Sequence, residues 1–336
     1  MNAPTSFVHS AVRLEPDYNM PQPTVAVIIP TRNRIDSLKR LLSQIIPYVS
    51  AHPECSVVVS DDGDASETRL ALTEEFSQVQ VVQGPHRGPA ANRNCGAAHS
   101  KGELIVFLDD DCVPASNLIS VYQDAAYANP EIAIFEGRIT AEGTVSSCAD
   151  SAPSNETGGY LWSCNFAVRR ELFEAIGGFD SRFPFAAMED NEFHFRAKQV
   201  SSIRFLPDAR VWHGFERRLG WKPVQHHSLS VLLYLHMHGL KEAERNSLYF
   251  LRMSAQIVLL TIPAHIRAGS FKDPSFLVYR VAANLQLALI ILFWRYRASL
   301  ATRFFPPCCD GCRRILSILA TDSSIAAPID EAARVR

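Results

Sequence analysis

The sequence of 336 residues is poor in glycine and contains no glycine-rich phosphate loop. It has 16 glycines, and neither Gly-x-x-x-x-Gly-Lys nor Gly-x-Gly-x-x-Gly occurs in it. P-loop and dinucleotide-binding proteins depend on these glycines, so both classes are excluded. Collagen-like and disordered proteins are excluded too, because 47 % of the residues are hydrophobic. The chain is long enough to bury the core of one large domain and an accessory part.

The sequence also lacks a disulfide framework. Its eight cysteines show no regular spacing, and no signal peptide precedes the first apolar segment. We therefore expect reduced thiols in a cytoplasmic protein. Cys309 and Cys312 form a lone Cys-x-x-Cys pair near the end of the chain. A zinc site needs more ligands than such a pair supplies, so we predict none there.

The chain has almost no net charge, −2, but its two halves differ in sign. Residues 1–220 carry 19 Lys or Arg against 28 Asp or Glu, a balance of −9, whereas residues 221–336 carry 14 against 7, a balance of +7. An acidic first half does not suit a nucleic acid, which needs a basic footprint. It suits an anionic substrate held through a divalent cation. The opposite signs predict two regions with different tasks.

Apolar segments alternate with helical patterns from residue 23 to about residue 135. Strands are predicted at 25–29, 57–59, 79–82 and 104–108, and helices at 35–46, 65–76 and 89–99. This alternation predicts an α/β fold of the Rossmann-like kind, with a mainly parallel sheet flanked by helices on both faces. Ligands of such sheets bind beyond the carboxyl ends of the strands.

The rest of the chain is divided by composition. We expect a tail at 1–22, a catalytic domain at 23–220, a helical region at 221–305 and a loosely ordered tail at 306–336. The helical region has apolar helices at 229–240, 248–264 and 281–294. The last apolar run has 14 residues, fewer than the roughly 20 that span a bilayer.

Asp109, Asp110 and Asp111 directly follow the predicted strand at 104–108. Alternation along an extended chain would point Asp109 and Asp111 to one side and Asp110 to the other. Adjacent carboxylates repel unless a cation neutralises them, and Mg²⁺ and Mn²⁺ prefer such oxygen ligands. An acidic turn in solvent is the alternative. The position after a buried strand favours the metal site.

Two further acidic pairs and one histidine could have either a functional or a purely structural role. Asp61 and Asp62 end the strand at 57–59 and could accept hydrogen bonds from a base or a ribose, or could simply form the turn. Glu189 and Asp190 begin a predicted helix at 189–200. One of them could take a proton from a substrate hydroxyl, or both could merely favour the helix dipole. His213 could be a metal ligand or a hydrogen-bonded structural residue.

Seven short segments of the sequence, taken in order along the chain, resemble those of the family 2 glycosyltransferases with the GT-A fold. The resemblance covers about residues 23–215. It is carried by residues 25–34, 57–63, 88–96, 102–114, 177–180, 189–190 and 211–213. It implies transfer of a sugar from a nucleotide-sugar donor to a hydroxyl acceptor, usually with inversion and with Mn²⁺ or Mg²⁺, in polysaccharide or glycolipid synthesis. A UDP-sugar is favoured, although Asp64 stands where many members have Ser.

The resemblance also implies roles for individual residues. Glu189 and Asp190 would form the catalytic pair, with Asp190 as the base. Asp109 and Asp111, the ends of the Asp-x-Asp motif, would meet ribose, diphosphate and metal, with His213 as a further metal ligand. The remaining donor contacts would come from Pro30, Thr31, Arg32, Asp62, Arg93, Asn94 and Asp110.

Two other functions stay open at this point. A nucleotidyltransferase shares the sheet topology, but usually has a glycine-rich loop after its first strand, and residues 30–34 contain no glycine. A catalytically silent sugar- or nucleotide-binding module would have lost the base or a metal ligand, and all are present. The sequence also leaves the oligomeric state open.

The basic helical region predicts docking on an anionic membrane. Arg295 and Arg297 follow the apolar run that ends at Trp294, an arrangement typical of a membrane interface. The protein would then work at the inner face of the membrane on a lipid-linked or glycan acceptor. The alternative is that these helices pack against the catalytic domain or form a dimer.

Overall fold

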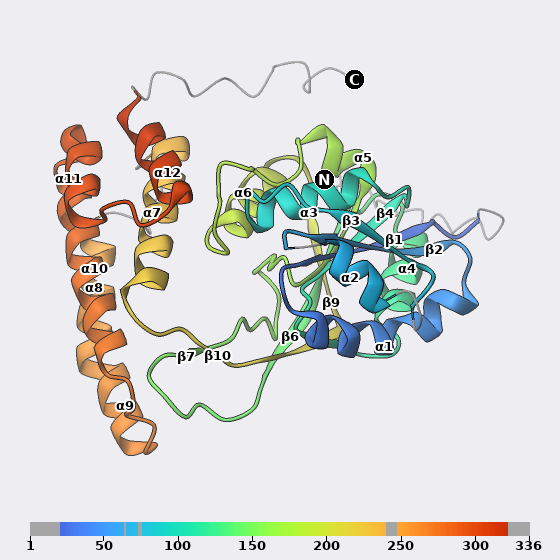
Figure 1. Ribbon diagram of the computed structural model, residues 1–336, viewed down its shortest axis with the longest axis horizontal. Coiled ribbons are helices and arrows are strands. Elements are labelled where there is room, and N and C mark those ends of the chain that lie inside the picture. The colour runs from blue at the N-terminus through green and yellow to red at the C-terminus, as the bar shows by residue number, and fades with distance from the viewer. Residues whose placement is uncertain (1–20, 64, 73–75, 240–246, 322–336) are drawn as a thin grey trace, which may run out of the picture.

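The computed structural model describes residues 21–63, 65–72, 76–239 and 247–321. A sheet of eight strands with helices on both faces forms one part of the molecule, and long helices form the other (Figure 1). The predicted tail at 1–22 lies outside the described residues except for residues 21 and 22. The α/β prediction is confirmed.

The first half of the sheet is parallel. Its strands run in the order β3-β2-β1-β4: β1 (Val25–Thr31), β2 (Cys55–Asp61), β3 (Val79–Gln83) and β4 (Leu104–Leu108). The connecting helices are α1 (Ile35–Ala51), α2 (Ala65–Leu72) and α3 (Pro89–Ala98). Every residue of β1 and β4 is buried, as expected for strands covered by helices on both faces. The predicted alternation of strand and helix is confirmed here.

The second half of the sheet is mixed, which the alternation did not predict. Its elements are β5 (Cys112–Pro114), α4 (Leu118–Ala128), β6 (Ile134–Glu142), β8 (Asn165–Arg169), α5 (Arg170–Ala175), α6 (Glu189–Val200) and β9 (Ile203–Gly214). Three of the seven strand pairings are antiparallel: β4 with β8, β8 with β6, and β9 with β5. β7 (Asp150–Ser151) and β10 (Glu216–Arg217) form a separate antiparallel pair. The chain thus brings Glu216 and His213 back beside the end of β4.

An aromatic cluster on one face of the sheet fixes the start of α6. Phe179 contacts Phe107 of β4 edge to face, with ring centroids 5.2 Å apart, and stacks on Phe193 of α6 at 4.8 Å. Phe166 and Phe173 complete the cluster. Aromatic pairs at these distances add to the free energy of burial. The turn at 177–180 is therefore held against the sheet, and the helix that follows starts at a defined place.

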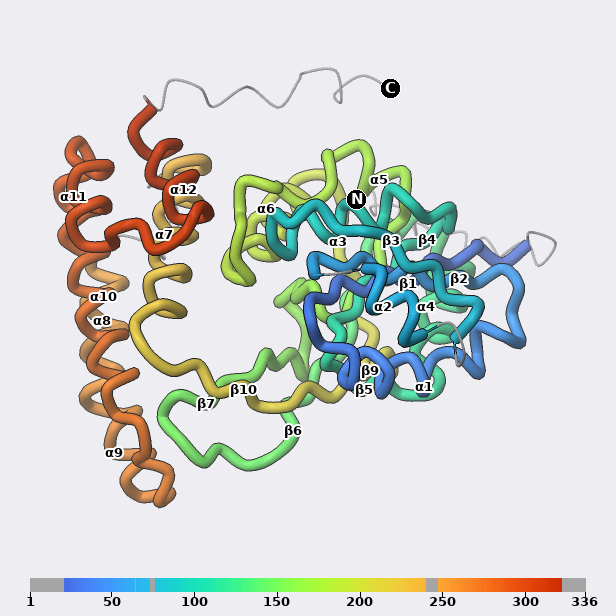
Figure 2. The backbone as a smooth tube through the Cα atoms, in the orientation of Figure 1, coloured from blue at the N-terminus to red at the C-terminus, as the bar shows by residue number. Residues whose placement is uncertain are grey.

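After β10 the chain enters α7 (Figure 2). The helical elements are α7 (Trp221–His238), α8 (Ser247–Gln256), η2 (Ile257–Thr261), α9 (Ile262–Arg267), α10 (Ser275–Leu292), η3 (Trp294–Tyr296), α11 (Arg297–Phe304) and α12 (Asp310–Ala320). α7 and α12 share a hydrophobic core with Phe183 and Met188 of the sheet-bearing part. The predicted loosely ordered tail is therefore wrong for α12, because Ile315 and Leu319 give that helix a buried apolar face. Residues 322–336 lie outside the described part.

Within the described part of the chain, two helices are long and apolar enough to cross a membrane. They are the continuous helix Ser247–Arg267, with 21 residues, and Ser275–Leu292, with 18. The second begins before the apolar run at 281–294, so the length inferred from that run was too short. The two helices lie side by side (Figure 1). Only 17 % of the apolar window of the first is buried, and Leu259 and Leu260 are among its exposed side chains.

Candidate active site

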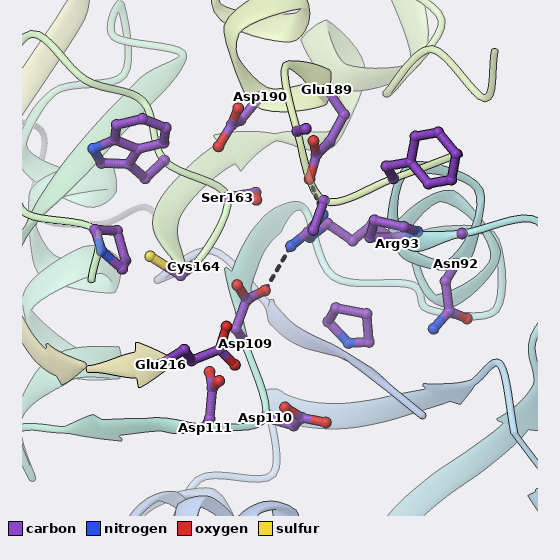
Figure 3. Close-up of a pocket in the computed structure, with 18 of the residues that line it drawn as sticks. Asn92, Arg93, Asp109, Asp110, Asp111, Ser163, Cys164, Glu189, Asp190 and Glu216 are labelled. Carbon is purple, nitrogen blue, oxygen red and sulfur yellow. Dashed lines mark hydrogen bonds and ion pairs between the residues drawn. The ribbon is translucent and has the colours of Figure 1, made fainter. Parts of the chain in front are cut away.

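A cavity of about 750 Å³ opens at the carboxyl ends of β1, β2 and β4. A volume of this size suits a small-molecule ligand. Eleven of the twelve predicted site residues line it: Pro30, Thr31, Arg32, Asp62, Arg93, Asp109, Asp110, Asp111, Glu189, Asp190 and His213. Figure 3 shows the acidic residues on two sides of this space, with Asp109 and Asp111 on one side and Glu189 and Asp190 on the other.

Asp110 is buried and faces β1. The Thr31 hydroxyl donates to Asp110 Oδ2 at 2.6 Å, so the carboxyl joins the ends of β1 and β4. Burial raises the pKa of Asp110 to about 7, against the Thr31 hydrogen bond and the charge of Arg34, which lower it. Asp110 is thus set apart from Asp109 and Asp111, as the alternation of side chains predicts.

Asp111 forms a pair with His213, the last but one residue of β9. His213 Nε2 lies 3.2 Å from Asp111 Oδ1, and its Nδ1 donates to the Gly214 carbonyl at 2.8 Å. Burial lowers the pKa of His213, but the hydrogen bond and charge of Asp111 raise it to about 9. A histidine whose other ring nitrogen is held by a carbonyl is oriented as metal-binding histidines are. The buried thiol of Cys112 lies in the same group.

Glu216 adds a third carboxylate, which sequence reasoning missed. Arg34 Nη2 lies 2.8 Å from Glu216 Oε1, and its Nη1 lies 2.7 Å from Asp111 Oδ2. Figure 3 shows the Glu216 carboxylate beside those of Asp109 and Asp111. No motif contains Glu216. It lies beside Asp109 and Asp111 because β10 directly follows β9 in the chain. Carboxylates and an imidazole are donors that suit Mn²⁺ or Mg²⁺, and Asp111 and His213 already have ligand atoms within 4.8 Å of each other.

Arg93 links the two sides of the cavity. Its side chain is 4 % exposed, with Nη2 2.6 Å from Asp109 Oδ1 and Nη1 3.3 Å from Glu189 Oε1. A buried guanidinium with two carboxylate partners is held in one orientation by its fixed fork of donors. Arg93 therefore sets the distance between the end of β4 and the start of α6.

Glu189 and Asp190 begin α6 after Met188, whose φ of 70° is rare for a residue other than glycine. Glu189 is buried, and its Oε2 has no hydrogen-bond partner among the described residues. Burial and the charge of Asp190 raise the pKa of Glu189 to about 8. Burial raises the pKa of Asp190 as well, while hydrogen bonds from Asn191 lower it. The Asn191 backbone N–H donates to Asp190 Oδ1 at 2.8 Å.

Asp62 holds a loop next to the cavity. Its Oδ1 accepts the His86 backbone N–H at 2.8 Å, and its Oδ2 accepts that of Gly88 at 3.0 Å. Gly88 has a φ of 95° and packs directly on Pro184, which leaves no room for a side chain. Asp62 thus stabilises the turn, the alternative considered from the sequence, and also lines the cavity.

Asn94 does not line the cavity, contrary to the prediction. Its side-chain amide donates to the Phe179 carbonyl at 2.7 Å and accepts the Phe179 backbone N–H at 2.9 Å. Asn94 therefore fastens α3 to the turn at 177–180. Asn92 lies on the cavity side of α3 instead, and it donates to the Ser60 carbonyl at 2.8 Å.

Sequence reasoning also missed one wall of the cavity. This wall comes from the irregular segment 151–188 and from α7, and includes Trp162, Phe185, His226 and His227. None of these residues stands in a recognisable motif. Periodicity alone does not predict which helix of a second region faces a cavity in the first.

Comparison with known proteins identifies the domain that forms the β-strand side of this cavity. Residues 26–177 match the family model "Glycosyl transferase family 2". These residues are a family 2 glycosyltransferase domain. The crystal structure of GalNAc-T7 with UDP, GalNAc and Mn²⁺ superimposes with a TM-score of 0.52 and 16 % identity, over 86 % of this chain and 59 % of that one. The fold of the glycosyltransferase domain is GT-A, as the sequence predicted.

Two curated relatives indicate the range of similar proteins. The pre-mycofactocin glycosyltransferase of Mycobacterium tuberculosis is 27 % identical over 217 residues, 58 % of this chain and 43 % of that protein. The GalNAc(5)-diNAcBac-PP-undecaprenol beta-1,3-glucosyltransferase of Campylobacter jejuni is 28 % identical over 109 residues, 31 % of this chain and 35 % of that protein. The chain therefore spans less than half the length of either relative.

Proposed function

We propose that this protein transfers a sugar from a nucleotide-sugar donor to a hydroxyl acceptor, with inversion and with a divalent cation. One observation carries the proposal. A metal-compatible group at the end of β4, within the residues that match family 2, faces the same cavity as the carboxylates of Glu189 and Asp190 at the start of α6.

The donor nucleotide would lie over the ends of β1 and β2. Thr31, Arg32 and Asp62 line that side of the cavity, which supports a nucleoside pocket, and a uridine nucleotide remains the prediction from the motifs. Asp109, Asp111, Glu216 and His213 would hold the cation. When bound, Mn²⁺ or Mg²⁺ would neutralise the negative charge that develops on the departing nucleoside diphosphate.

Asp190 would act as the general base. The acceptor oxygen forms a bond to the anomeric carbon while the bond from that carbon to the diphosphate oxygen breaks, and Asp190 takes the hydroxyl proton. Glu189 is already paired with Arg93 and has a fully buried carboxylate, whereas Asp190 is partly accessible from the cavity. A raised pKa suits a base that works near neutral pH. The base and the leaving group would lie on opposite sides of the cavity, and this arrangement supports inversion by a single displacement.

The helical region supports a membrane-bound acceptor. The helices Ser247–Arg267 and Ser275–Leu292 expose apolar side chains along their outer faces. Residues 247–321 carry nine Lys or Arg against two Asp or Glu, and basic residues favour an anionic lipid surface. The Campylobacter jejuni relative is named for an undecaprenol-linked substrate. A lipid-linked acceptor at the inner membrane face is therefore the substrate class we propose.

Nucleotide release tests the proposed activity. The purified full chain, in detergent, is mixed with nucleotide-sugars and Mn²⁺, and free nucleoside diphosphate is measured with and without EDTA. We expect release that needs the metal and rises when an acceptor lipid is added. Synthesis of nucleotide-sugar from a nucleoside triphosphate and a sugar phosphate would instead identify a nucleotidyltransferase. Binding of nucleotide without any turnover would indicate a silent module.

A further inference from the structure

Four side chains of types that bind metals meet at the α7 wall of the cavity, and none of them belongs to the predicted Mn²⁺ or Mg²⁺ site. Cys308 and Cys309 precede α12, Cys312 lies in its first turn, and His226 comes from α7. Their sulfur and nitrogen atoms all lie within 4.8 Å of one another. The sequence predicted no zinc here because the Cys-x-x-Cys pair had no further ligands in view. The fold supplies the missing histidine from 82 residues upstream of Cys308.

The distances agree with those around a tetrahedral zinc ion. Zn–S bonds of about 2.3 Å and a Zn–N bond of about 2.0 Å place two sulfurs about 3.8 Å apart and a nitrogen about 3.5 Å from each sulfur. Here Cys312 Sγ lies 3.5 Å from both Cys308 Sγ and Cys309 Sγ. His226 Nε2 lies 3.6 Å from Cys308 Sγ and 3.8 Å from Cys309 Sγ. A disulfide would use two of these thiols and leave the third thiol and the imidazole without a shared partner.

We propose that His226, Cys308, Cys309 and Cys312 bind one structural Zn²⁺. Three thiolates and one imidazole complete a tetrahedral shell with no open position, as in structural rather than catalytic zinc sites. The ion joins α7 to the start of α12. Gln225 supports the same junction by donating to the Pro306 carbonyl.

The zinc site also supports the wall of the active-site cavity. The His226 ring stacks on Phe185, with ring centroids 3.7 Å apart and an interplanar angle of 5°. Phe185 lines the cavity and lies four residues before Glu189. It packs so closely on Gly311 that a Cβ there would lie 2.8 Å from Phe185 Cζ. Zinc would therefore hold the segment that leads into the catalytic pair.

Metal analysis of the full chain tests the site directly. The protein is purified with a reductant and without a chelator, and zinc is measured by mass spectrometry of the elements. We expect one zinc per chain. Cys312→Ser and His226→Phe should lose it, and the second change keeps an aromatic ring to stack on Phe185. His226→Cys should retain zinc, because it restores a fourth ligand.

Two control variants locate the bound ion. Cys95→Ser removes a partly exposed thiol on α3 and should leave one zinc per chain. Asp111→Asn should also leave the zinc in place, which separates this site from the predicted Mn²⁺ site. Replacement of zinc by Co²⁺ should give the strong visible absorption of tetrahedral thiolate coordination, and Cys312→Ser should abolish that absorption.

Two results would overturn the zinc site. One is a reduced, folded wild-type chain that contains no zinc and takes up none when Zn²⁺ is added. The other is zinc that survives both Cys312→Ser and His226→Phe. A chain that lacks zinc and is two mass units lighter without reductant would indicate a disulfide. None of these measurements uses a sugar substrate, so a protein with one zinc and no transferase activity would contradict only the proposed function.

Discussion

Arg93 Nη2 lies 2.6 Å from Asp109 Oδ1, so a buried cation from α3 is already paired with a carboxylate predicted to bind metal. The same guanidinium reaches Glu189. A bound cation would therefore share Asp109 with Arg93. A substitution of Arg93 or Asp109 would then alter the contacts on both sides of the cavity.

Arg93→Met should destabilise the protein strongly. It leaves Asp109 and Glu189 without their shared partner, and loss of one member of a buried ion pair costs about 3–5 kcal/mol. Chemical denaturation measures the free energy of unfolding. The double variant Arg93→Met/Glu189→Gln should recover part of the loss, because it removes one unpaired charge. If the double variant lost as much free energy of unfolding as Arg93→Met and Glu189→Gln lose together when measured singly, Arg93 and Glu189 would not be coupled.

Asp190→Asn should lower the rate of transfer by about 10²- to 10⁴-fold, the usual contribution of a general base. Binding of nucleoside diphosphate, measured by thermal shift, should stay within a few-fold of wild type, because the base contacts the acceptor. Glu171→Gln, which removes an acidic side chain from the first turn of α5, is the control for charge. If Glu189→Gln abolished transfer and Asp190→Asn did not, the base would be Glu189.

The rate should fall in acid at a pH above the ordinary range for aspartate. Burial raises the pKa of Asp190, and only the ionised carboxylate accepts a proton, so kcat/KM should rise with pH through that pKa. The acid limb of this pH–rate profile reports the coupled pair Glu189 and Asp190 together. Asn191 Nδ2 donates to Asp190 Oδ1 at 3.2 Å and lowers its pKa. Asn191→Ala should therefore move the limb to higher pH, and an unchanged profile would exclude Asp190 as the titrating base.

Mn²⁺ should stabilise the wild-type protein and not Asp111→Asn. A ligand that binds only the folded state raises its stability in proportion to RT ln(1 + [L]/Kd). Thermal unfolding is followed over a series of Mn²⁺ concentrations, with exposed Asp124→Asn as the control. The wild type and the control should gain stability together. An equal gain in Asp111→Asn would place the cation elsewhere, and full turnover in excess EDTA would exclude metal dependence.

The outer face of the helix Ser247–Arg267 should bind lipid. Leu259 and Leu260 are 69 % and 62 % exposed, and a charge there opposes contact with hydrocarbon. Leu259→Glu/Leu260→Glu should reduce flotation with anionic liposomes, whereas Leu70→Glu on α2, at a site 75 % exposed, should not. Repeating the flotation at high salt separates the contribution of charge attraction to lipid binding from that of apolar contact. A wild-type protein that never floats and elutes as a dimer would assign this face to a second copy.

The sequence predicts the first half of the sheet well because those strands are buried on both faces. The segments at 25–29 and 104–108 are continuous apolar runs, and each strand is found where its run lies. β9 is different. Arg204, Asp208 and Arg210 interrupt the apolar pattern of this strand, which begins at Ile203. A partly exposed strand gives no continuous apolar signal.

The candidate site shows the same division. Asp109 and Asp190 follow local signals, a strand end and a helix start, which the sequence contains in full. Glu216 and His226 reach the cavity region through tertiary packing of β10 and α7, and no local pattern marks them. Asn94 stands in a motif beside cavity-lining residues, but each residue of an α-helix is rotated by about 100° from the one before it. Its amide therefore points toward Phe179 instead.

The place of α7 has a consequence for hybrid enzymes. Because His226 and His227 line the cavity, exchange of the region after residue 220 with that of a relative would replace one wall of the catalytic chamber along with the apolar helices. Under the proposed function, acceptor choice and membrane attachment would therefore change together in such a hybrid. A hybrid meant to alter attachment alone should keep α7 and α12 from the parent and exchange only the helices between them.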